Sequence, residues 1–417
     1  MNVKQRLILL SFLQFFIWGS WLISTGGYLF SMGFSGIEIG KVFSTLGIAS
    51  LFMPAIMGIV ADRWVNAEKL LGICHLIGAG CLLWASTIKD PGMMFIVMLL
   101  NSMAYMPTIS MNNSVSYRVL EQKNYDIIKT FPPIRVWGTI GFICAMWMVD
   151  LTGFAKTQAQ FYVAATASII MGLYSFTIPA CVPPGQTKKG SLFSSLGLDA
   201  FVLFRQPRMA IFFLFSMLLG AALQITNTFG DSFLRDFGLN NDFKDSFVVK
   251  HPLLMLSLSQ ISETIFILTI PFFLKKFGIK KVMLMSILAW VFRFGLFSLG
   301  DPGGGVFFLF LSMIVYGMAF DFFNISGSLF VEKETPTSMR ASAQGLFMMV
   351  TNGFGAVIGG IGSGWVVDYF TQNGVKDWSM IWIVFAGYAL VLAVFFPLLF
   401  KYRHFPEEEA DQLSYRN

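Results

Sequence analysis

Residues 379–400 read SMIWIVFAGYALVLAVFFPLLF and contain no charged side chain. A helix needs about 20 predominantly apolar residues to cross the hydrocarbon core of a bilayer. Further apolar runs of similar length, each bounded by charges, Gly or Pro, fill the chain before this stretch. The sequence therefore predicts an all-α integral membrane protein with twelve transmembrane helices, at residues 7–30, 38–61, 69–88, 92–117, 133–154, 160–182, 208–234, 248–274, 280–299, 304–331, 341–369 and 379–400.

The composition excludes a soluble protein. Of the 417 residues, 55% are hydrophobic and 12% are charged, and the mean hydropathy is +0.68. An average soluble domain has about a quarter of its residues charged, and a disordered chain needs low hydrophobicity with high net charge. The net charge is +6, but the basic residues lie in short runs between apolar segments, which argues against nucleic acid as a partner.

The longest interior loop, Pro183–Gln206, divides the predicted helices into two groups of six. Two such halves, with the substrate at the midplane between them, are the expected layout of a large class of transporters. Most loop Lys and Arg residues lie on the side of the N-terminus, so both termini are predicted to be cytoplasmic. We expect an N-terminal half at 1–182, a cytoplasmic linker at 183–207, a C-terminal half at 208–402 and a cytoplasmic tail at 403–417.

The sequence offers no enzyme chemistry. It has no HExxH motif, no P-loop and no serine nucleophile elbow. Its four cysteines lie within or at the ends of apolar runs, without the spacing of a disulfide framework or a metal site. We therefore expect no catalytic residue and no metal.

Polar side chains within the apolar runs are the candidates for function, because a charge at the bilayer centre is expensive. Arg135, Thr139 and Phe142 are spaced i, i+4, i+7, which places a cation, a hydroxyl and a ring on one helical face. This pattern favours the lining of a polar cavity. The alternative is that Arg135 lies near the cytoplasmic end of its helix and extends to lipid headgroups.

Two consecutive predicted helices carry polar pairs three residues apart. Gln224 and Asn227 form the first pair, and Gln260 and Glu263 form the second. Carboxamides present both donors and acceptors, which suits a ligand with an alternating polar edge such as a nucleobase or a sugar. The alternative is that these groups make interhelical hydrogen bonds that hold the bundle together.

The predicted helix at 304–331 carries an aromatic face and a carboxylate. Tyr316 and Phe320 are four residues apart, and Asp321 follows directly. The rings can stack on a planar base or cover a sugar, or they can pack or face lipid. Asp321 is either functional or the structural partner of a buried cation such as Arg135. For Arg293, which lies in the predicted helix at 280–299, the sequence offers no evident partner.

Glu263 and Asp321 are also candidates for energy coupling, because buried carboxylates mark proton relays in transporters. A carboxyl group exposed in turn to two compartments can bind a proton from one and release it to the other. No cluster in the sequence argues specifically for sodium.

One loop resembles a known superfamily. Residues 58–64, GIVADRW, look like the G-x-x-x-D-R loop of the major facilitator superfamily, with Gly58, Asp62 and Arg63 at the defining positions. The basic tail of that loop is kept only in part, as Glu68-Lys69. The resemblance implies the major facilitator fold, and it indicates that this loop is a gating motif and not a ligand site.

More specific matches closely resemble the nucleoside:proton symporter family. The resemblance runs from the first predicted helix to the last, and it is lost at residues 185–200 and after Tyr402. The matching runs are SFLQF at 11–15, FPPIR at 131–135, LQITN at 223–227, SQISET at 259–264, FDFFNISG at 320–327 and RASAQG at 340–345.

This resemblance implies a proton-driven, alternating-access importer of purine and pyrimidine nucleosides in the bacterial cytoplasmic membrane, with the proton as coupling ion and no cofactor. We expect a monomer in the lipid bilayer. A close relative in the family prefers xanthosine, so the substrate range stays open. The rival classes are a facilitator for another solute and a membrane enzyme or receptor. The positions that match the nucleoside site of the family are Arg135, Thr139, Phe142, Gln224, Asn227, Gln260, Glu263, Tyr316 and Phe320, and Asp321 matches a position implicated in the transport cycle.

Overall fold

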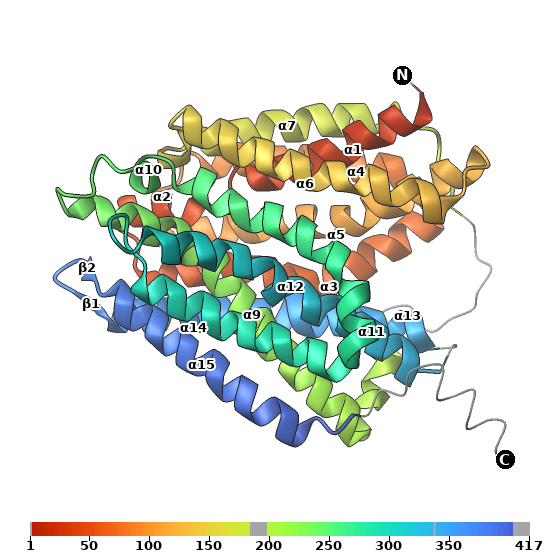
Figure 1. The fold of residues 1–417 in the computed structure, drawn as a ribbon. Coiled ribbons are helices and arrows are strands. Elements are labelled where there is room, and N and C mark those ends of the chain that lie inside the picture. Colours follow the sequence, from red (N-terminus) through yellow and green to blue (C-terminus); the bar gives the residue numbers. More distant parts are fainter. Residues whose placement is uncertain (1, 184–197, 337–338, 403–417) are drawn as a thin grey trace, which may run out of the picture.

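The computed structural model describes residues 2–183, 198–336 and 339–402, which form a bundle of long helices (Figure 1). Most of the predicted linker and the predicted tail at 403–417 lie outside these residues. The first half of the chain contains α1 (Val3–Gly19), α2 (Thr25–Ser31), α3 (Gly36–Arg63), α4 (Ala67–Ala85), α5 (Pro91–Gln122), α6 (Ile127–Leu151), the short η1 (Phe154–Lys156) and α7 (Ala159–Ser175).

The second half repeats this helical architecture. Its long helices are α9 (Pro207–Asp236), α11 (Pro252–Leu299), α12 (Val306–Glu334), α14 (Ala356–Tyr369) and α15 (Trp378–Leu399). A π-helical turn, η5 (Met349–Gly355), joins α13 (Arg340–Met348) to α14. The short elements are η2 (Leu198–Arg205), η3 (Phe237–Leu239), α10 (Phe247–Lys250) and a hairpin of β1 (Thr371–Gln372) and β2 (Val375–Lys376), in which Thr371 pairs with Lys376.

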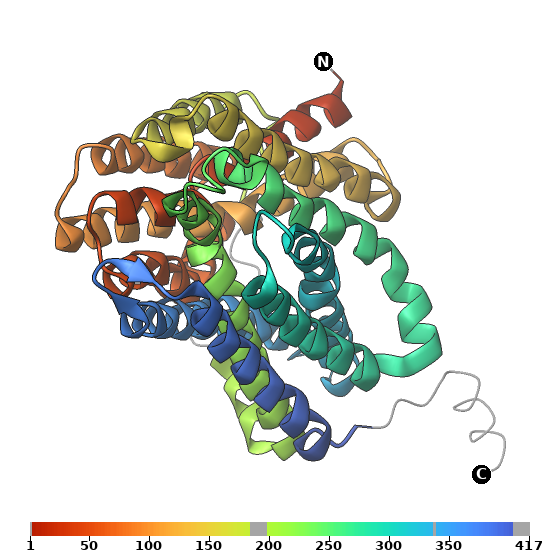
Figure 2. The ribbon, with the colours of Figure 1, turned by 60° about the vertical axis from the view of Figure 1, so that its left-hand side comes forward.

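The helices account for the predicted crossings. Within the described residues, nine helices are long and apolar enough to span a membrane. The shorter α1 and α7, with 17 residues each, complete the first half. The 48 residues of α11 form two spans, because the chain reverses at Gly278 with φ of 74° (Figure 2), a conformation that glycine adopts without steric penalty. The all-α membrane fold predicted from the sequence is confirmed.

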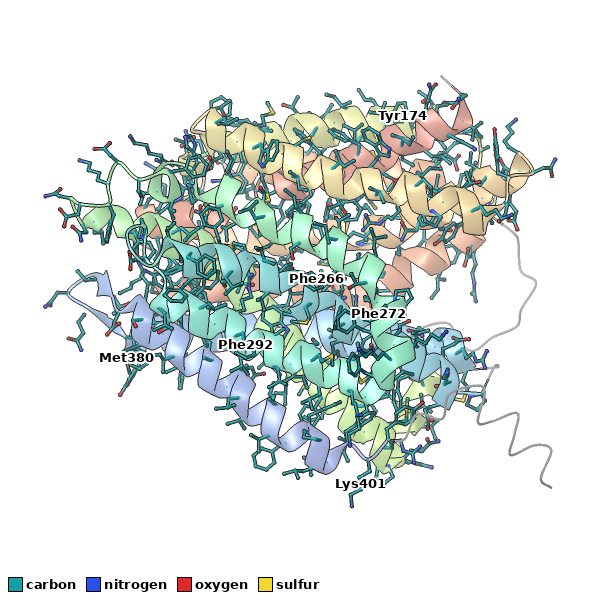
Figure 3. All side chains as sticks on the ribbon, in the orientation of Figure 1. Tyr174, Phe266, Phe272, Phe292, Met380 and Lys401 are labelled. Carbon is teal, nitrogen blue, oxygen red and sulfur yellow. The ribbon has the colours of Figure 1, made fainter. Side chains whose placement is uncertain are left out.

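The outside of the bundle is apolar. Phe272 and Phe292 in α11 are 61% and 60% exposed, and both lie on the outer surface of the bundle (Figure 3). Soluble monomers rarely expose contiguous apolar patches of more than a few hundred Å². This surface is therefore suited to lipid, and polar groups have to be satisfied inside the bundle.

Close contacts join the two halves on the side opposite the termini. At Gly40 of α3, an added Cβ would lie 2.1 Å from the carbonyl oxygen of Gly360 in α14, and at Gly364 it would lie 2.3 Å from that of Gly36. The Asp368 carboxylate accepts the N–H groups of Gly36 and Ile37 at 2.6 and 2.8 Å, which satisfies free donors at the start of α3. Small residues let the two helix backbones meet.

A second polar contact joins the halves between α6 and α11. Asp150 Oδ2 lies 2.9 Å from His251 Nδ1, and its Oδ1 accepts the N–H of Leu253 at 3.3 Å. Trp147 Nε1 donates to Ser257 Oγ at 2.8 Å. In the described part of the chain, all hydrogen bonds between the halves lie near the starts of α3 and α11 and the ends of α6 and α14. The structure is therefore closed on the side opposite the termini.

Substitution of Gly360 by Ala is expected to disrupt this closure. The new Cβ would lie 2.7 Å from the Gly40 carbonyl oxygen, so the helices must separate, and overpacking of this kind costs about 1–3 kcal/mol. The thermal unfolding midpoint of the purified protein should fall. Gly362→Ala is the matched control two residues away on α14, where an added Cβ meets nothing within 4 Å. Equal midpoints for the two variants would contradict the packing argument.

Candidate functional site

Arg135 is held inside the bundle. Its guanidinium carbon lies 4.0 Å from the ring centroid of Phe15 in α1. Gly138 makes room for this contact, because a Cβ there would lie 2.7 Å from both Arg135 Nη1 and Phe15 Cδ2. The cation therefore packs against α1 and not at the lipid-facing surface, which disfavours the headgroup alternative.

The other predicted residues of α6 lie beside an aromatic cluster. Phe142 is buried and meets the edge of Trp18 with centroids 6.3 Å apart. Trp18 in turn lies 5.8 Å from Tyr105 of α5. Thr139, one turn from Arg135, is half-buried. The first half thus contributes a cation, a hydroxyl and a group of rings.

A fully buried polar network supports this wall. Gln14 Oε1 lies 3.0 Å from His75 Nε2, and Gln14 Nε2 donates to Thr108 Oγ1 at 2.8 Å. The Tyr105 hydroxyl donates to the Gln14 carbonyl oxygen at 2.6 Å, and His75 Nδ1 lies 3.3 Å from Ser168 Oγ. Both ends of the Gln14 amide are used, so this residue supports the site from behind.

In the second half, α11 and α12 approach closely beside the predicted residues. A Cβ at Gly317 would lie 2.6 Å from the backbone of Ser262. This approach brings Tyr316 of α12 against Gln260 and within electrostatic range of Glu263, both on α11. Gln260 and Glu263 are each half-buried in the middle of the membrane span.

The aromatic face predicted on α12 is present. The rings of Tyr316 and Phe320 are parallel within 6°, with centroids 6.1 Å apart. Tyr316 is buried, which rules out a lipid-facing ring. Phe320 lines a narrow cavity of about 20 Å³ together with Leu223 of α9 and Asn324. The cavity places the face of α12 opposite the helix that carries Gln224.

The charges of the site are close but unpaired. Arg135 and Glu263 come from opposite halves and lie near enough for their charges to interact. Asp321 is 3% exposed and lies near Glu263. Within the described residues, none of the three forms a salt bridge, and Asp321 Oδ2 has no hydrogen-bond partner. The alternative in which Asp321 pairs with Arg135 is therefore not what the structure contains.

Among the described residues, the amide pair of α9 makes no side-chain hydrogen bond to another helix. Gln224 is buried, and its Nε2 donates to Thr228 Oγ1 of the same helix at 3.4 Å. Asn227 is half-buried, and no hydrogen bond of its side chain is found in the described part of the chain. An interhelical brace therefore does not explain this pair.

The predicted gating motif lies on the side of the termini. Asp62 forms a salt bridge of 2.7 Å with Arg118 of α5, which belongs to the same half. Arg63 is half-buried, and a Cβ at Gly58 would meet nothing within 4 Å. In this structure the motif braces helices within the first half.

Sequence reasoning missed three contributions to this region. Phe15 lies against Arg135, and the buried Arg293 lies 4.5 Å from the Tyr316 ring centroid. The contact of Asp150 with His251 joins the halves at the closed side. The i, i+3 spacing of Phe15 and Trp18 was a usable signal, but nothing in the sequence pairs residues as far apart as Asp150 and His251.

Comparison with known proteins identifies relatives of this chain. The family model of the nucleoside H+ symporters matches residues 1–405. The xanthosine permease of Escherichia coli (strain K12) is 58% identical over 410 residues, which cover 98% of each chain. Nucleoside permease NupG of the same strain is 55% identical over 406 residues and 97% of each chain.

The fold is shared with solved structures. The crystal structure of a mutant of nucleoside transporter NupG superposes with a TM-score of 0.94 at 55% identity, over 96% of this chain and 100% of that one. A second NupG structure gives a TM-score of 0.92 over 97% of this chain. A bacterial homologue of the human lysosomal transporter Spinster, at 12% identity and a TM-score of 0.72, shares the fold alone.

Replacing Gln14 by Leu tests the supporting network. The change would remove the partner of His75 Nε2 and the amide donor to Thr108 Oγ1 in a fully buried site, and an unsatisfied buried polar group costs about 1–3 kcal/mol. The thermal midpoint of the purified protein should therefore fall. Gln122→Leu, which removes one exposed hydrogen bond to the Ala180 carbonyl oxygen, should change it little. An unchanged midpoint for Gln14→Leu would mean that the network is not needed.

Proposed function

We infer that this chain, which belongs to the nucleoside H+ symporter family and is a proton-coupled nucleoside importer, binds its substrate between its two halves. The observation that carries this site is that Arg135 from the first half lies close enough to Glu263 from the second for their charges to interact, while the described residues contain no salt bridge between them. Unpaired polar groups in a membrane interior mark substrate and ion pathways.

The nucleoside is bound by two kinds of group. Gln224, Asn227 and Gln260 offer donors and acceptors to the base and the ribose, and Arg135, Thr139 and Glu263 complete the polar set. The parallel rings of Tyr316 and Phe320 provide an apolar face for the planar base, because aromatic rings favour offset stacking. Phe142 forms the facing aromatic wall.

The proton is carried by Glu263 or Asp321. Asp321 is buried with one oxygen unpartnered, and burying an ionised carboxylate without a partner is expensive. The free-energy cost of burying Asp321 is lower when its carboxyl group is protonated and therefore neutral. Glu263 faces the cation of the opposite half, so its charge state also acts on the attraction between the halves.

The orientation in the membrane follows from the charge of the loops. The start of α1 and the end of α15 lie on one side of the bundle (Figure 1), and the excess of Lys and Arg in the loops of that side supports a location in the bacterial cytoplasm. The structure then represents the state that is closed to the outside. In the outward-open state we propose that the motif of Gly58, Asp62 and Arg63 braces the cytoplasmic side.

We propose that the chain transports at least one of three nucleosides: uridine, adenosine and xanthosine. Xanthosine permease and nucleoside permease NupG resemble the chain at 58% and 55% identity, so both substrate groups are tested together. In liposomes containing the purified chain, labelled nucleoside should accumulate under an inward proton gradient. Dissipation of the gradient with a protonophore should release the accumulated label. Uptake that equilibrates without concentrating would contradict proton coupling, and uptake of none of the three would contradict the substrate assignment.

Glu263→Gln is expected to abolish gradient-driven accumulation, because the amide keeps the size of the side chain but carries no exchangeable charge. Substrate exchange without a gradient should persist at a reduced rate, because Glu263 also belongs to the polar set that binds the nucleoside. Glu334→Gln is the matched control at the cytoplasmic end of α12, where the carboxylate forms a partly exposed ion pair of 3.0 Å with Arg208, a kind of contact that contributes little. Undiminished accumulation in Glu263→Gln would assign the proton to Asp321, for which Asp321→Asn is the corresponding test.

A further inference from the structure

Arg293 is a buried cation that the proposed cycle does not use. It lies in the second part of α11 and is 2% exposed. Its Nη1 donates to the Ser312 carbonyl oxygen at 2.9 Å and to Ser259 Oγ at 3.3 Å. Ser312 Oγ donates back to the Arg293 carbonyl oxygen at 2.9 Å. These bonds fix the guanidinium between both parts of α11 and α12.

No carboxylate balances this charge at close range. Within the described residues Arg293 forms no salt bridge, and its Nε has no hydrogen-bond partner. A buried charge without a partner is expensive. Two rings take the place of an acid, since the guanidinium carbon lies 4.5 Å from the Tyr316 centroid and 5.0 Å from the Phe297 centroid. Cation–π contacts are strongest when they are desolvated, as here.

The Tyr316 ring links this cation to the substrate site. It is parallel to Phe320, and it meets the edge of Trp290 with centroids 6.0 Å apart. Gln260 and Glu263 lie beside it. Arg293 and Trp290 therefore restrain the ring from one α-helical segment, while the polar residues of the site lie on another.

We propose that Arg293 is a positioning residue for nucleoside binding. Its guanidinium holds the Tyr316 ring parallel to Phe320, so that the two rings form one platform for the base. Arg293 does not touch the substrate. A platform that is already ordered before binding loses less side-chain freedom when the base arrives, and this preorganisation strengthens affinity. The inference rests on the proposed function, because it assigns a task to the aromatic face of that site.

A double-mutant cycle between Arg293 and Tyr316 tests the proposal. The dissociation constants of uridine, adenosine and xanthosine are measured by calorimetry on the purified full chain, and the tightest ligand is used. Arg293→Met should weaken binding by about tenfold, which lies between the effects of an exposed and a desolvated cation–π contact. In the Tyr316→Leu background, the same change should have an effect of less than about twofold, because coupled residues give non-additive losses.

Two further variants separate positioning from structural support. Phe297→Leu removes the second ring that contacts the Arg293 guanidinium, and this ring is not part of the proposed platform. The variant should have a lower thermal midpoint but an unchanged dissociation constant for the nucleoside. Arg293→Lys keeps the buried charge and should bind within about threefold of the unmodified chain. Arg293→Gln, which removes the charge but keeps a hydrogen-bond donor for the Ser312 carbonyl oxygen, replaces Arg293→Met in the cycle if that variant is not monodisperse, with the same non-additive loss expected.

The possible failures are distinguishable. Additive losses in the cycle, or unchanged affinity of Arg293→Met with a lowered thermal midpoint, would overturn the inference and leave the proposed function intact. An unmodified chain that binds none of the three nucleosides would overturn the proposed function, and the inference with it.

Discussion

The absence of water in the bilayer core determines where this chain places its polar groups. Every backbone N–H and C=O in that region needs a partner within the protein, which restricts the spanning segments to helices. Charged side chains then have few acceptable positions. In the described residues, the charged side chains deep in the bundle point inward. Arg135 packs against the Phe15 ring, and the Asp321 side chain is 3% exposed. The same constraint that builds the bundle therefore also concentrates its chemistry.

The closed side of the bundle depends on small residues. Apolar side chains gain little by leaving lipid for another helix, so helices in membranes associate through close packing and hydrogen bonds. Gly40 against Gly360 provides the close packing, and Asp368 at the start of α3 provides the hydrogen bonds. Such contacts are short-ranged. The two halves can therefore separate there without exposing a large apolar core, which alternating access requires.

The sequence predicted the fold and most of the polar residues because both follow from local rules. Apolar run length gives the spans, and helical spacing places Tyr316 beside Phe320 or Arg135 beside Thr139. Helical spacing alone did not predict that these two faces belong to the same site. That prediction came from the resemblance to the symporter family. The reversal at Gly278 also lies where charges interrupt the apolar run. Contacts between distant segments were not predictable in this way, since nothing local relates Asp150 to His251 or Arg293 to Tyr316.

The arrangement of charges links proton binding to motion. Arg135 belongs to the first half, whereas Glu263 and Asp321 belong to the second, and no salt bridge neutralises any of them within the described residues. The attraction between Arg135 and Glu263 therefore acts across the interface only while Glu263 is ionised. A nucleoside such as uridine is neutral and adds no net charge to the interface, whereas a proton does. In the proposed mechanism, the proton thus alters the attraction between the halves, and the substrate binds in the space between them.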